Sequence, residues 1–215
     1  MLKYMLDLKK LFAIAICFSV LGCSIDNRTA SKPELPPLIE KAISMFYDEN
    51  RNDEVISLLN NSDSTNLNPL ELQLRRIIMA GAWCESNNLS KSRTILNGIP
   101  NDQLKKNSYL NSWHQSISGL LLFRENKLSE AYSVLIQENT KFNEPCVLAL
   151  NKRILARITI AMNDYKQGLE WLLESSLLFE KAGKPKSIAI NEKIIGRCYM
   201  LVENFDEAIK HLKAA

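Results

Sequence analysis

Apolar residues recur at three- and four-residue spacing along nearly the whole chain from residue 37 onward. This period is typical of amphipathic helices, and no stretch of any length shows the strict alternation that indicates a half-buried strand. Glycines are few, at seven in 215 residues, so long loops built on glycine are not expected. The pattern predicts an all-α protein in which helices follow one another from residue 37 to the C-terminus.

The clearest pair of helices lies at the end of the chain, in "NEKIIGRCYMLVENFDEAIKHLKAA". Gly196 and Tyr199 fall on its first helix, Phe205 begins its second helix, and Ala208 follows one turn later. This arrangement of large, small and aromatic positions resembles the tetratricopeptide repeat, a helix-turn-helix unit of about 34 residues. Small residues such as Gly196 and Ala208 stand where the two helices of the unit cross closely.

The same register recurs upstream, with Gly119 and Ala156 at the small position of two further first helices. The matching small positions of the second helices lie 37 to 40 residues apart, at Val55, Ser92, Ala131, Gly168 and Ala208. The resemblance implies a right-handed α-solenoid of about five tetratricopeptide-like helix pairs, each of which packs on its neighbours. We expect this repeat domain to span residues 38–215, with units near 36–68, 73–105, 112–145, 149–185 and 189–215.

The N-terminus has the charge order of a secretory signal. Residues 1–10 contain three lysines and one aspartate, and residues 11–21 form an apolar run that is shorter than the roughly 20 residues needed to cross a bilayer. The sequence "VLGC" that ends at Cys23 resembles the lipobox of bacterial lipoproteins. The resemblance implies that residues 1–22 are removed and that Cys23 is lipidated. The alternatives are an ordinary cleaved signal with a chance cysteine, or a short buried helix.

Residues 23–37 contain three prolines and no apolar period, which predicts an extended tether between the lipid and the folded domain. Ser24 follows the cysteine, where many lipoproteins retained at the inner membrane have aspartate. The resemblance therefore implies a lipid-anchored protein of the cell envelope, on the outer membrane and facing the periplasm.

Charge and reactive residues exclude several other functions. The formal charge is +3 and falls to +1 without residues 1–22, which gives no electrostatic basis for binding nucleic acid. His114 and His211 are far apart in the sequence, and neither lies at metal-ligand spacing from other candidate ligands, so no metal site is expected. Cys84, Cys146 and Cys198 fall in different units and are expected to be small buried residues rather than disulfide partners, with an intermolecular bridge as the alternative.

No sequence pattern indicates catalysis. The chain has no nucleophile beside a base, no glycine-rich phosphate loop after a strand and no paired acids in a convincing frame. "LNGIPND" contains Gly98 and Pro100, which predict a helix stop and a turn. We therefore expect a protein that is not an enzyme and that needs no cofactor.

The resemblance implies that partners bind in a concave groove lined by the first helices of the units. The register places Arg153 and Arg157 of the fourth unit and Lys193 and Arg197 of the fifth unit on this groove, as a basic strip. Arginine forms strong charge-assisted hydrogen bonds with carboxylates. The strip predicts a protein or extended peptide partner with an acidic, carboxylate-bearing segment, although a merely solvated polar face is the alternative.

An apolar wall is predicted beside the strip in the third unit. The groove-facing positions there are Trp113, Leu120 and Phe123. Buried aromatic side chains supply much of the contact energy of protein interfaces. The alternative is that Trp113 and Phe123 belong to the core.

The chain stops inside the second helix of the fifth unit, which would leave Ile195, Ile209 and Leu212 partly without cover. A solenoid needs a polar outer face at its ends. This predicts self-association, a partner at this end, or a longer protein.

The leading interpretation is a lipid-anchored scaffold or adaptor in the bacterial envelope. The alternatives are the N-terminal sensory repeat region of a longer or truncated signalling regulator and, more weakly, an accessory lipoprotein of glycan uptake.

Overall fold

The computed structural model describes residues 32–47, 51–138 and 144–215. The predicted signal peptide, Cys23 and the first part of the tether lie outside the described residues. The described part contains eleven helices and no strand. The helices are α2 (Pro37–Tyr47), α3 (Asn52–Asn60), α4 (Pro69–Glu85), α5 (Leu89–Asn97), α6 (Asn101–Lys106), α7 (Ser108–Arg124), α8 (Leu128–Glu138), α9 (Pro145–Ala161), α10 (Tyr165–Lys181), α11 (Pro185–Leu201) and α12 (Phe205–Ala214).

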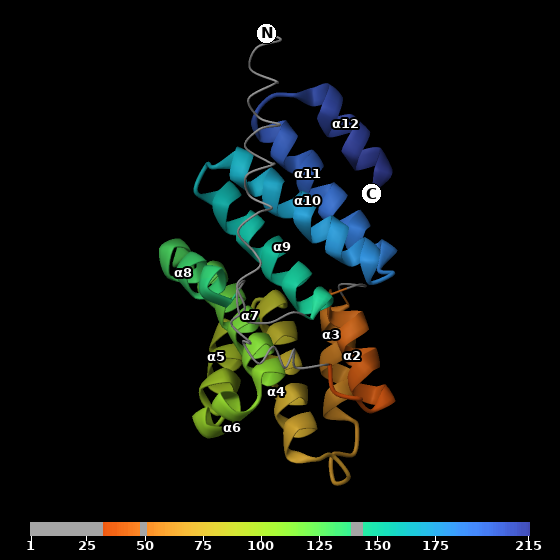
Figure 1. Cartoon of the computed structure of the whole chain (residues 1–215), viewed down its shortest axis with the longest axis vertical. Helices are drawn as coiled ribbons and strands as arrows, with labels where there is room; N and C mark the ends of the chain where they lie inside the picture. Colours follow the sequence, from red (N-terminus) through yellow and green to blue (C-terminus); the bar gives the residue numbers. More distant parts are fainter. Residues whose placement is uncertain (1–31, 48–50, 139–143) are drawn as a thin grey trace, which may run out of the picture.

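Ten of these helices form five consecutive pairs, namely α2 with α3, α4 with α5, α7 with α8, α9 with α10, and α11 with α12. The first three pairs lie side by side in one half of the molecule and α9 to α12 extend from them, so that α11 and α12 lie at the opposite end from α4, α5 and α6 (Figure 1). The predicted all-α solenoid of about five helix pairs is confirmed. The short helix α6, which the sequence pattern presented only as a stop and a turn, is inserted between the second and third pairs and buries Leu104.

The turns inside the pairs repeat one backbone conformation. In the second, third, fourth and fifth pairs, the residue two positions after the end of the first helix has a positive φ. These residues are Asn87 (65°), Asn126 (61°), Asn163 (65°) and Glu203 (59°). Asparagine is one of the few residues with a side chain that adopts this conformation routinely. In three of these turns the next side chain, from Asn88, Asp164 or Asn204, accepts a hydrogen bond from the backbone of the following helix and caps it.

The small positions of the repeat lie where paired helices cross. A Cβ atom at Gly119 would lie 2.5 Å from Cγ of Leu135, and one at Gly196 would lie 2.6 Å from Cγ of Leu212. Ala131, Ala156 and Ala208 are buried, as are Val55 and Ser92 at the weaker copies of the pattern. The backbones of paired helices approach closely only because these side chains are small.

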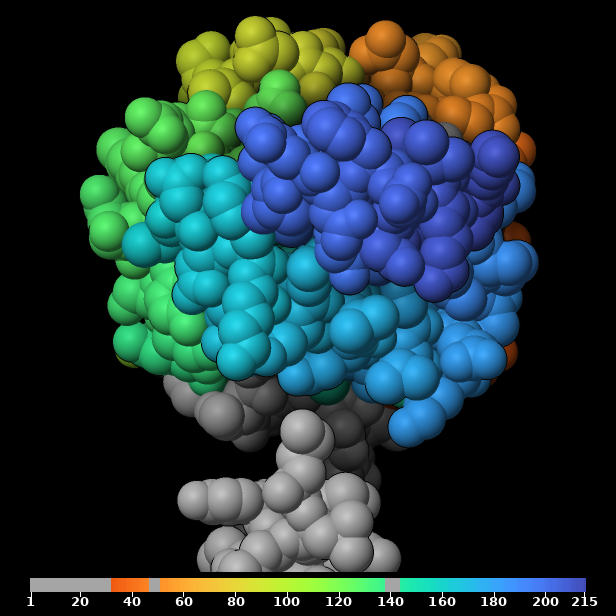
Figure 2. Space-filling view, turned by 90° about the horizontal axis from the view of Figure 1, so that it is seen from above, coloured from red at the N-terminus to blue at the C-terminus, as the bar shows by residue number. Residues whose placement is uncertain are grey.

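The core is a continuous apolar layer that extends from α2 to α10, with a second cluster around Leu172 and Ile195 at the C-terminal end. Ile195 is therefore buried, against the prediction, because Ala156 and Leu172 of the fourth pair cover it. Ile209 and Leu212 on α12 are exposed. Figure 2 looks onto this end of the molecule, where the last helix pair lies in front of the fourth. Tyr199 of the fifth pair stacks on His211 at 5.4 Å between ring centroids.

Candidate functional site

A pocket of about 240 Å³ lies where the first helices of all five pairs meet. α2 contributes Phe46, α4 contributes Glu85 and α7 contributes Leu120, while α9 and α11 supply the remaining lining. The lining includes all four cations that the repeat register had placed on the groove, Arg153, Arg157, Lys193 and Arg197. We call this site the basic pocket, because these four cations face one carboxylate, that of Glu85.

Arg153 lies at the floor of the basic pocket and is only 5% exposed. Its Nε donates a 2.7 Å hydrogen bond to Oδ1 of Asn191, and a terminal nitrogen donates a 2.8 Å bond to the backbone oxygen of Ser187. Its guanidinium also lies 4.6 Å from the ring centroid of Phe179. Arg153 therefore joins α9 to α10 and α11, and it does not project into an open groove as the register had suggested.

Arg157 lies one turn further along α9 and forms an ion pair across the groove. Its Nη1 donates to Oε1 of Glu85 at 2.7 Å, and Nη1 of Arg124 donates to Oε2 of the same carboxylate at 3.3 Å. The Arg157 guanidinium also lies 4.9 Å from the ring centroid of Phe123. The Glu85 carboxylate thus links the fourth pair to the second, two units away along the solenoid.

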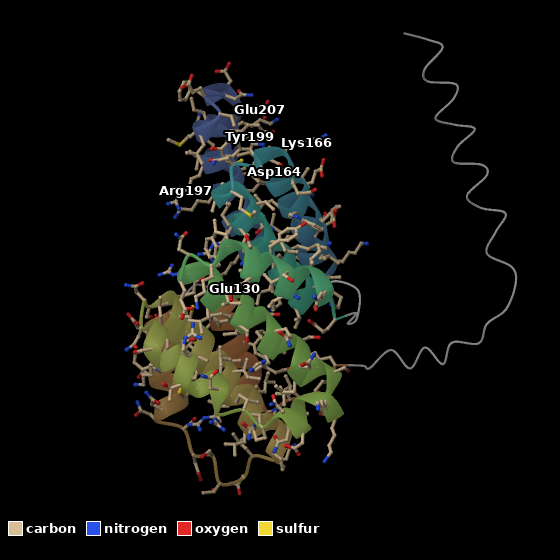
Figure 3. The ribbon with its side chains drawn as sticks, turned by 90° about the vertical axis from the view of Figure 1, so that its left-hand side faces the viewer. Glu130, Asp164, Lys166, Arg197, Tyr199 and Glu207 are labelled. Carbon is tan, nitrogen blue, oxygen red and sulfur yellow. The ribbon has the colours of Figure 1, made fainter. Side chains whose placement is uncertain are left out.

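Lys193 and Arg197 remain at the open side of the basic pocket. They are one turn apart on α11, both are exposed, and neither forms an ion pair with a described residue. Figure 3 shows Arg197 projecting from the helix ribbon toward solvent. These two cations are the part of the predicted strip that can receive a ligand carboxylate without first giving up an internal partner.

The predicted apolar wall is only partly at the groove. Trp113 is 1% exposed and belongs to the core, together with Phe46, Leu120 and Leu150. It does not offer its ring to a partner, because it is enclosed in the core cluster to which α2, α4 and α9 also contribute buried side chains. Leu120 lines the basic pocket, and Phe123 is half-buried beneath the Arg157 guanidinium.

Glu85, the carboxylate of the basic pocket, and its partner Arg124 were not predicted from the sequence. They occupy equivalent positions, at the end of the first helices of the second and third pairs, 39 residues apart like the small positions Ser92 and Ala131. The opposite charges of Glu85 and Arg124 at equivalent positions of successive units could have indicated that these two side chains form an ion pair. The pairing with Arg157 had no such signal, because its partner lies two units away.

Two further hollows, of about 360 and 370 Å³, lie outside the basic pocket. One lies beside His114, Arg93 and Ile99, and the other beside Tyr109, Cys146 and Glu144. Burial lowers the pKa of His114 and raises the pKa of Tyr109. Arg93 is already paired with Glu125, so the first hollow offers no unpaired cation from that residue.

The three cysteines of the repeat domain are free thiols and all are buried. Burial raises the pKa of Cys84 to about 12 and also raises the pKa of Cys198, which makes these thiols poor nucleophiles. Among the described residues no group of three or more His, Cys, Asp or Glu side chains is arranged to hold a metal ion. None of the helices in the described part combines the length and the apolar character needed to span a membrane.

Comparisons with known proteins agree with the architecture. No family model matches the chain. In sequence it is similar to a protein from Arabidopsis thaliana named Protein KINESIN LIGHT CHAIN-RELATED 1, with 31% identity over 86 residues, which is 39% of this chain and 14% of the other. In structure it is similar to a signal transduction ATPase with numerous domains (STAND) from Pyrococcus horikoshii, which carries a tetratricopeptide repeat sensor.

The STAND protein superposes with a TM-score of 0.57 at 18% identity, over 82% of this chain and 28% of the other, and the match falls on its repeat sensor. The chain therefore has the fold of a tetratricopeptide-like helical solenoid. The apo form of RapI is a more distant likeness, with a TM-score of 0.38 at 16% identity over 82% of this chain and 63% of the other. The chain spans less than two thirds of each of these proteins.

Proposed function

We propose that this tetratricopeptide-like protein is a non-enzymatic scaffold or adaptor that binds an acidic segment of a partner protein in the basic pocket. The observation that carries the proposal is the pair of exposed cations Lys193 and Arg197, which lie one turn apart on α11 and have no carboxylate partner among the described residues. Four cations against one carboxylate give the basic pocket a strong positive potential. Such a potential favours acidic partners and rejects basic ones.

The shape of the basic pocket suits a peptide better than a small molecule. It is contributed by five helices and is open on one side, and Ile190 and Ile194 of α11 line it together with the cations of that helix. An extended or helical segment can place carboxylates against Lys193 and Arg197 while its apolar side chains contact the isoleucines. Polar contacts at the rim then give specificity, and the apolar contacts give affinity.

We also propose that the protein is lipidated at Cys23 and acts in the bacterial cell envelope, on the outer membrane and facing the periplasm. This part rests on the charge order of residues 1–21 and on the lipobox-like "VLGC". Metabolic labelling with an alkyne fatty acid tests it directly. Label on the native chain and none on Cys23→Ser supports lipidation, whereas an unlabelled native chain contradicts it.

Crosslinking and pull-down of the full-length protein from intact cells tests the binding site. Lys193→Glu with Arg197→Glu should abolish capture of a specific envelope partner, because both uncommitted cations become repulsive. The matched control is Lys166→Glu with Lys181→Glu, which makes the same charge change at exposed positions of α10. Capture that survives the α11 reversal, or that is lost equally in the control, would contradict the proposed site.

A second candidate is a sensory repeat region within a longer or truncated signalling regulator. The observation that favours it is the exposed apolar surface of α12 at Phe205 and Ile209, which a further helix could cover. Sequencing of the transcript tests it, because an open frame that continues into a membrane helix and a regulator domain supports this function. A stop codon directly after Ala215 would contradict the longer regulator.

A further inference from the structure

The Glu85 carboxylate is the negative group of the basic pocket. Its two oxygens accept from different arginines, Oε1 from Arg157 at 2.7 Å and Oε2 from Arg124 at 3.3 Å. We infer that Glu85 is a specificity-determining residue, an internal carboxylate that competes with the partner's carboxylate for Arg157. The inference rests on the proposed function, since it assumes that an acidic segment binds in the basic pocket.

Arg157 is placed so that it can change partners. It lines the same pocket as Lys193 and Arg197, and its side chain is 25% exposed, so a ligand can reach it. The face of its guanidinium is held by the Phe123 ring at 4.9 Å. This cation–π contact does not involve Glu85, and it keeps the guanidinium in the pocket if Glu85 withdraws.

Glu85 is placed so that it can give up Arg157 without losing all of its hydrogen bonds. Arg124 continues to pair with Oε2, and Arg124 itself is held by a 3.4 Å hydrogen bond from its Nη2 to Oδ1 of Asn87. An unpaired charge at a half-buried site would be costly. Because Arg124 remains, the exchange replaces one carboxylate on Arg157 with another and leaves no group without a partner.

The exchange of Glu85 for a partner carboxylate on Arg157 makes the basic pocket discriminate between neutral and acidic segments. A neutral segment leaves the bond between Glu85 and Arg157 intact and gains nothing from Arg157. An acidic segment that binds at Lys193 and Arg197 can bring a second carboxylate to Arg157, but it must displace Glu85 and overcome its repulsion. Glu85 therefore lowers the affinity for acidic segments and reserves Arg157 for partners with more than one carboxylate. The exchange also releases the link between α4 and α9.

Binding of a labelled octaglutamate peptide to the full-length chain tests this inference. Glu85→Gln keeps the shape of the side chain and removes its charge, so the dissociation constant should fall by about three- to tenfold, the scale of a partly exposed ion pair. Octaglutamine should show no change. The control is Glu125→Gln, which removes an equally half-buried carboxylate that pairs with Arg93 and Lys127 outside the basic pocket, and it should change binding less than twofold.

A double-mutant cycle separates competition from a general change in charge. In an Arg157→Met background, Glu85→Gln should tighten binding much less, because the contested cation is absent and only the repulsion by Glu85 is removed. If Glu85→Gln has no effect, or tightens binding equally with Met at position 157, the competition is overturned. The proposed function still stands in that case, provided that Lys193→Glu with Arg197→Glu abolishes octaglutamate binding; if that reversal has no effect, the proposed function itself fails.

A spectroscopic readout covers the case in which Glu85→Gln does not fold. In the native chain, the Nε–H resonance of Arg157 should shift as octaglutamate is added, in parallel with the side-chain amine signal of Lys193. A shift at Lys193 with an unchanged Arg157 signal would overturn the competition and leave the binding site intact.

Discussion

Nε of Arg153 donates a 2.7 Å hydrogen bond to Oδ1 of Asn191 across the boundary between the fourth and fifth helix pairs. The amide nitrogen of Asn191 in turn donates to the hydroxyl oxygen of Ser175 on α10 at 3.0 Å. Asn191 and Ser175 are fully buried. The fifth pair is therefore fixed to the fourth by a polar network as well as by apolar packing, and such networks are costly to break in part.

We predict that Arg153→Met destabilises the fold by about 1–3 kcal/mol, because Oδ1 of Asn191 loses its donor inside the core. The midpoint of urea unfolding measures the effect. Arg197→Met is the control, because Arg197 is exposed and unpaired, and it should stay within about 0.5 kcal/mol of the native chain. Equal stability of the two variants would show that the buried network is not a structural link. If Arg153→Met is destabilised as expected, charge reversal at Arg153 tests folding more than binding.

The contact between Gly119 and Leu135 gives a second prediction. Gly119→Ala places a Cβ atom 2.5 Å from Cγ of Leu135, so α7 and α8 must move apart. Overpacking of this kind costs about 1–3 kcal/mol, and the better helix propensity of alanine returns about 1 kcal/mol. We expect a net loss of stability in urea unfolding.

The matched test of this clash is the same substitution beside a smaller partner. Leu135→Ala alone should cost about 2–5 kcal/mol, because it leaves a cavity in the core. With Ala at position 135, Gly119→Ala should become neutral or stabilising, since the Cγ atom that it would meet is gone. Simple additivity of the two changes would contradict the close-crossing explanation of the small position.

The repeat could be predicted from the sequence because its determinants are local. Two helices cross closely only where a small residue stands, and Gly119, Ala156 and Gly196 mark the small position of three first helices at spacings of 37 and 40 residues. The helix α6 was not predicted because it is a short insertion outside the repeat, shortly after α5 ends at Gly98.

The site was predicted less completely, for a physical reason. The register of a single unit identified Lys193 and Arg197, which depend only on the face of α11. It could not show that Trp113 is buried or that Arg157 pairs with Glu85, 72 residues away. Those facts depend on how tightly the solenoid curls, which is the sum of small rotations over several units and leaves no local pattern.

His114 gives a prediction about pH. Its Nδ1 is buried without a hydrogen-bond partner in the described structure, and burial lowers its pKa below the usual 6.5. As the pH falls through about 6.5, His114 is therefore protonated in the unfolded chain while it is still neutral in the folded chain. The stability contributed by neutral His114 is intact above pH 6.5 and is lost as pH falls below that value.

Urea unfolding at pH 7.5 and at pH 5 should show this loss. The native chain should lose up to about 2 kcal/mol more than His114→Gln over this range, because the unfolded histidine can gain no more than the difference between pH 6.5 and pH 5. Glutamine keeps a polar group near the backbone oxygen of Leu96, which lies 3.4 Å from Nε2 of His114. An identical pH dependence of the two chains would contradict the assignment of a buried neutral imidazole.

The exposed apolar side chains of α12 give the last prediction. Phe205 is 59% exposed and Ile209 is 52% exposed, whereas Tyr165 and Leu169, at the equivalent positions of α10, are half-buried. The neighbouring helix α11 packs against α10 and covers part of its apolar surface. An apolar surface of this kind tends to be covered by another molecule, so we expect the full-length chain to self-associate through α12.

Analytical ultracentrifugation over a range of concentrations tests this expectation. The sedimentation coefficient of the native chain should rise with concentration, and Phe205→Asp with Ile209→Asp should abolish the rise by placing two charges on the contact. Leu173→Asp with Leu177→Asp is the matched control, because these side chains of α10 are also apolar and are each 56% exposed. Association that persists in the α12 variant, or that disappears equally in both, would place the contact elsewhere. A native chain that is monomeric throughout would contradict self-association through α12.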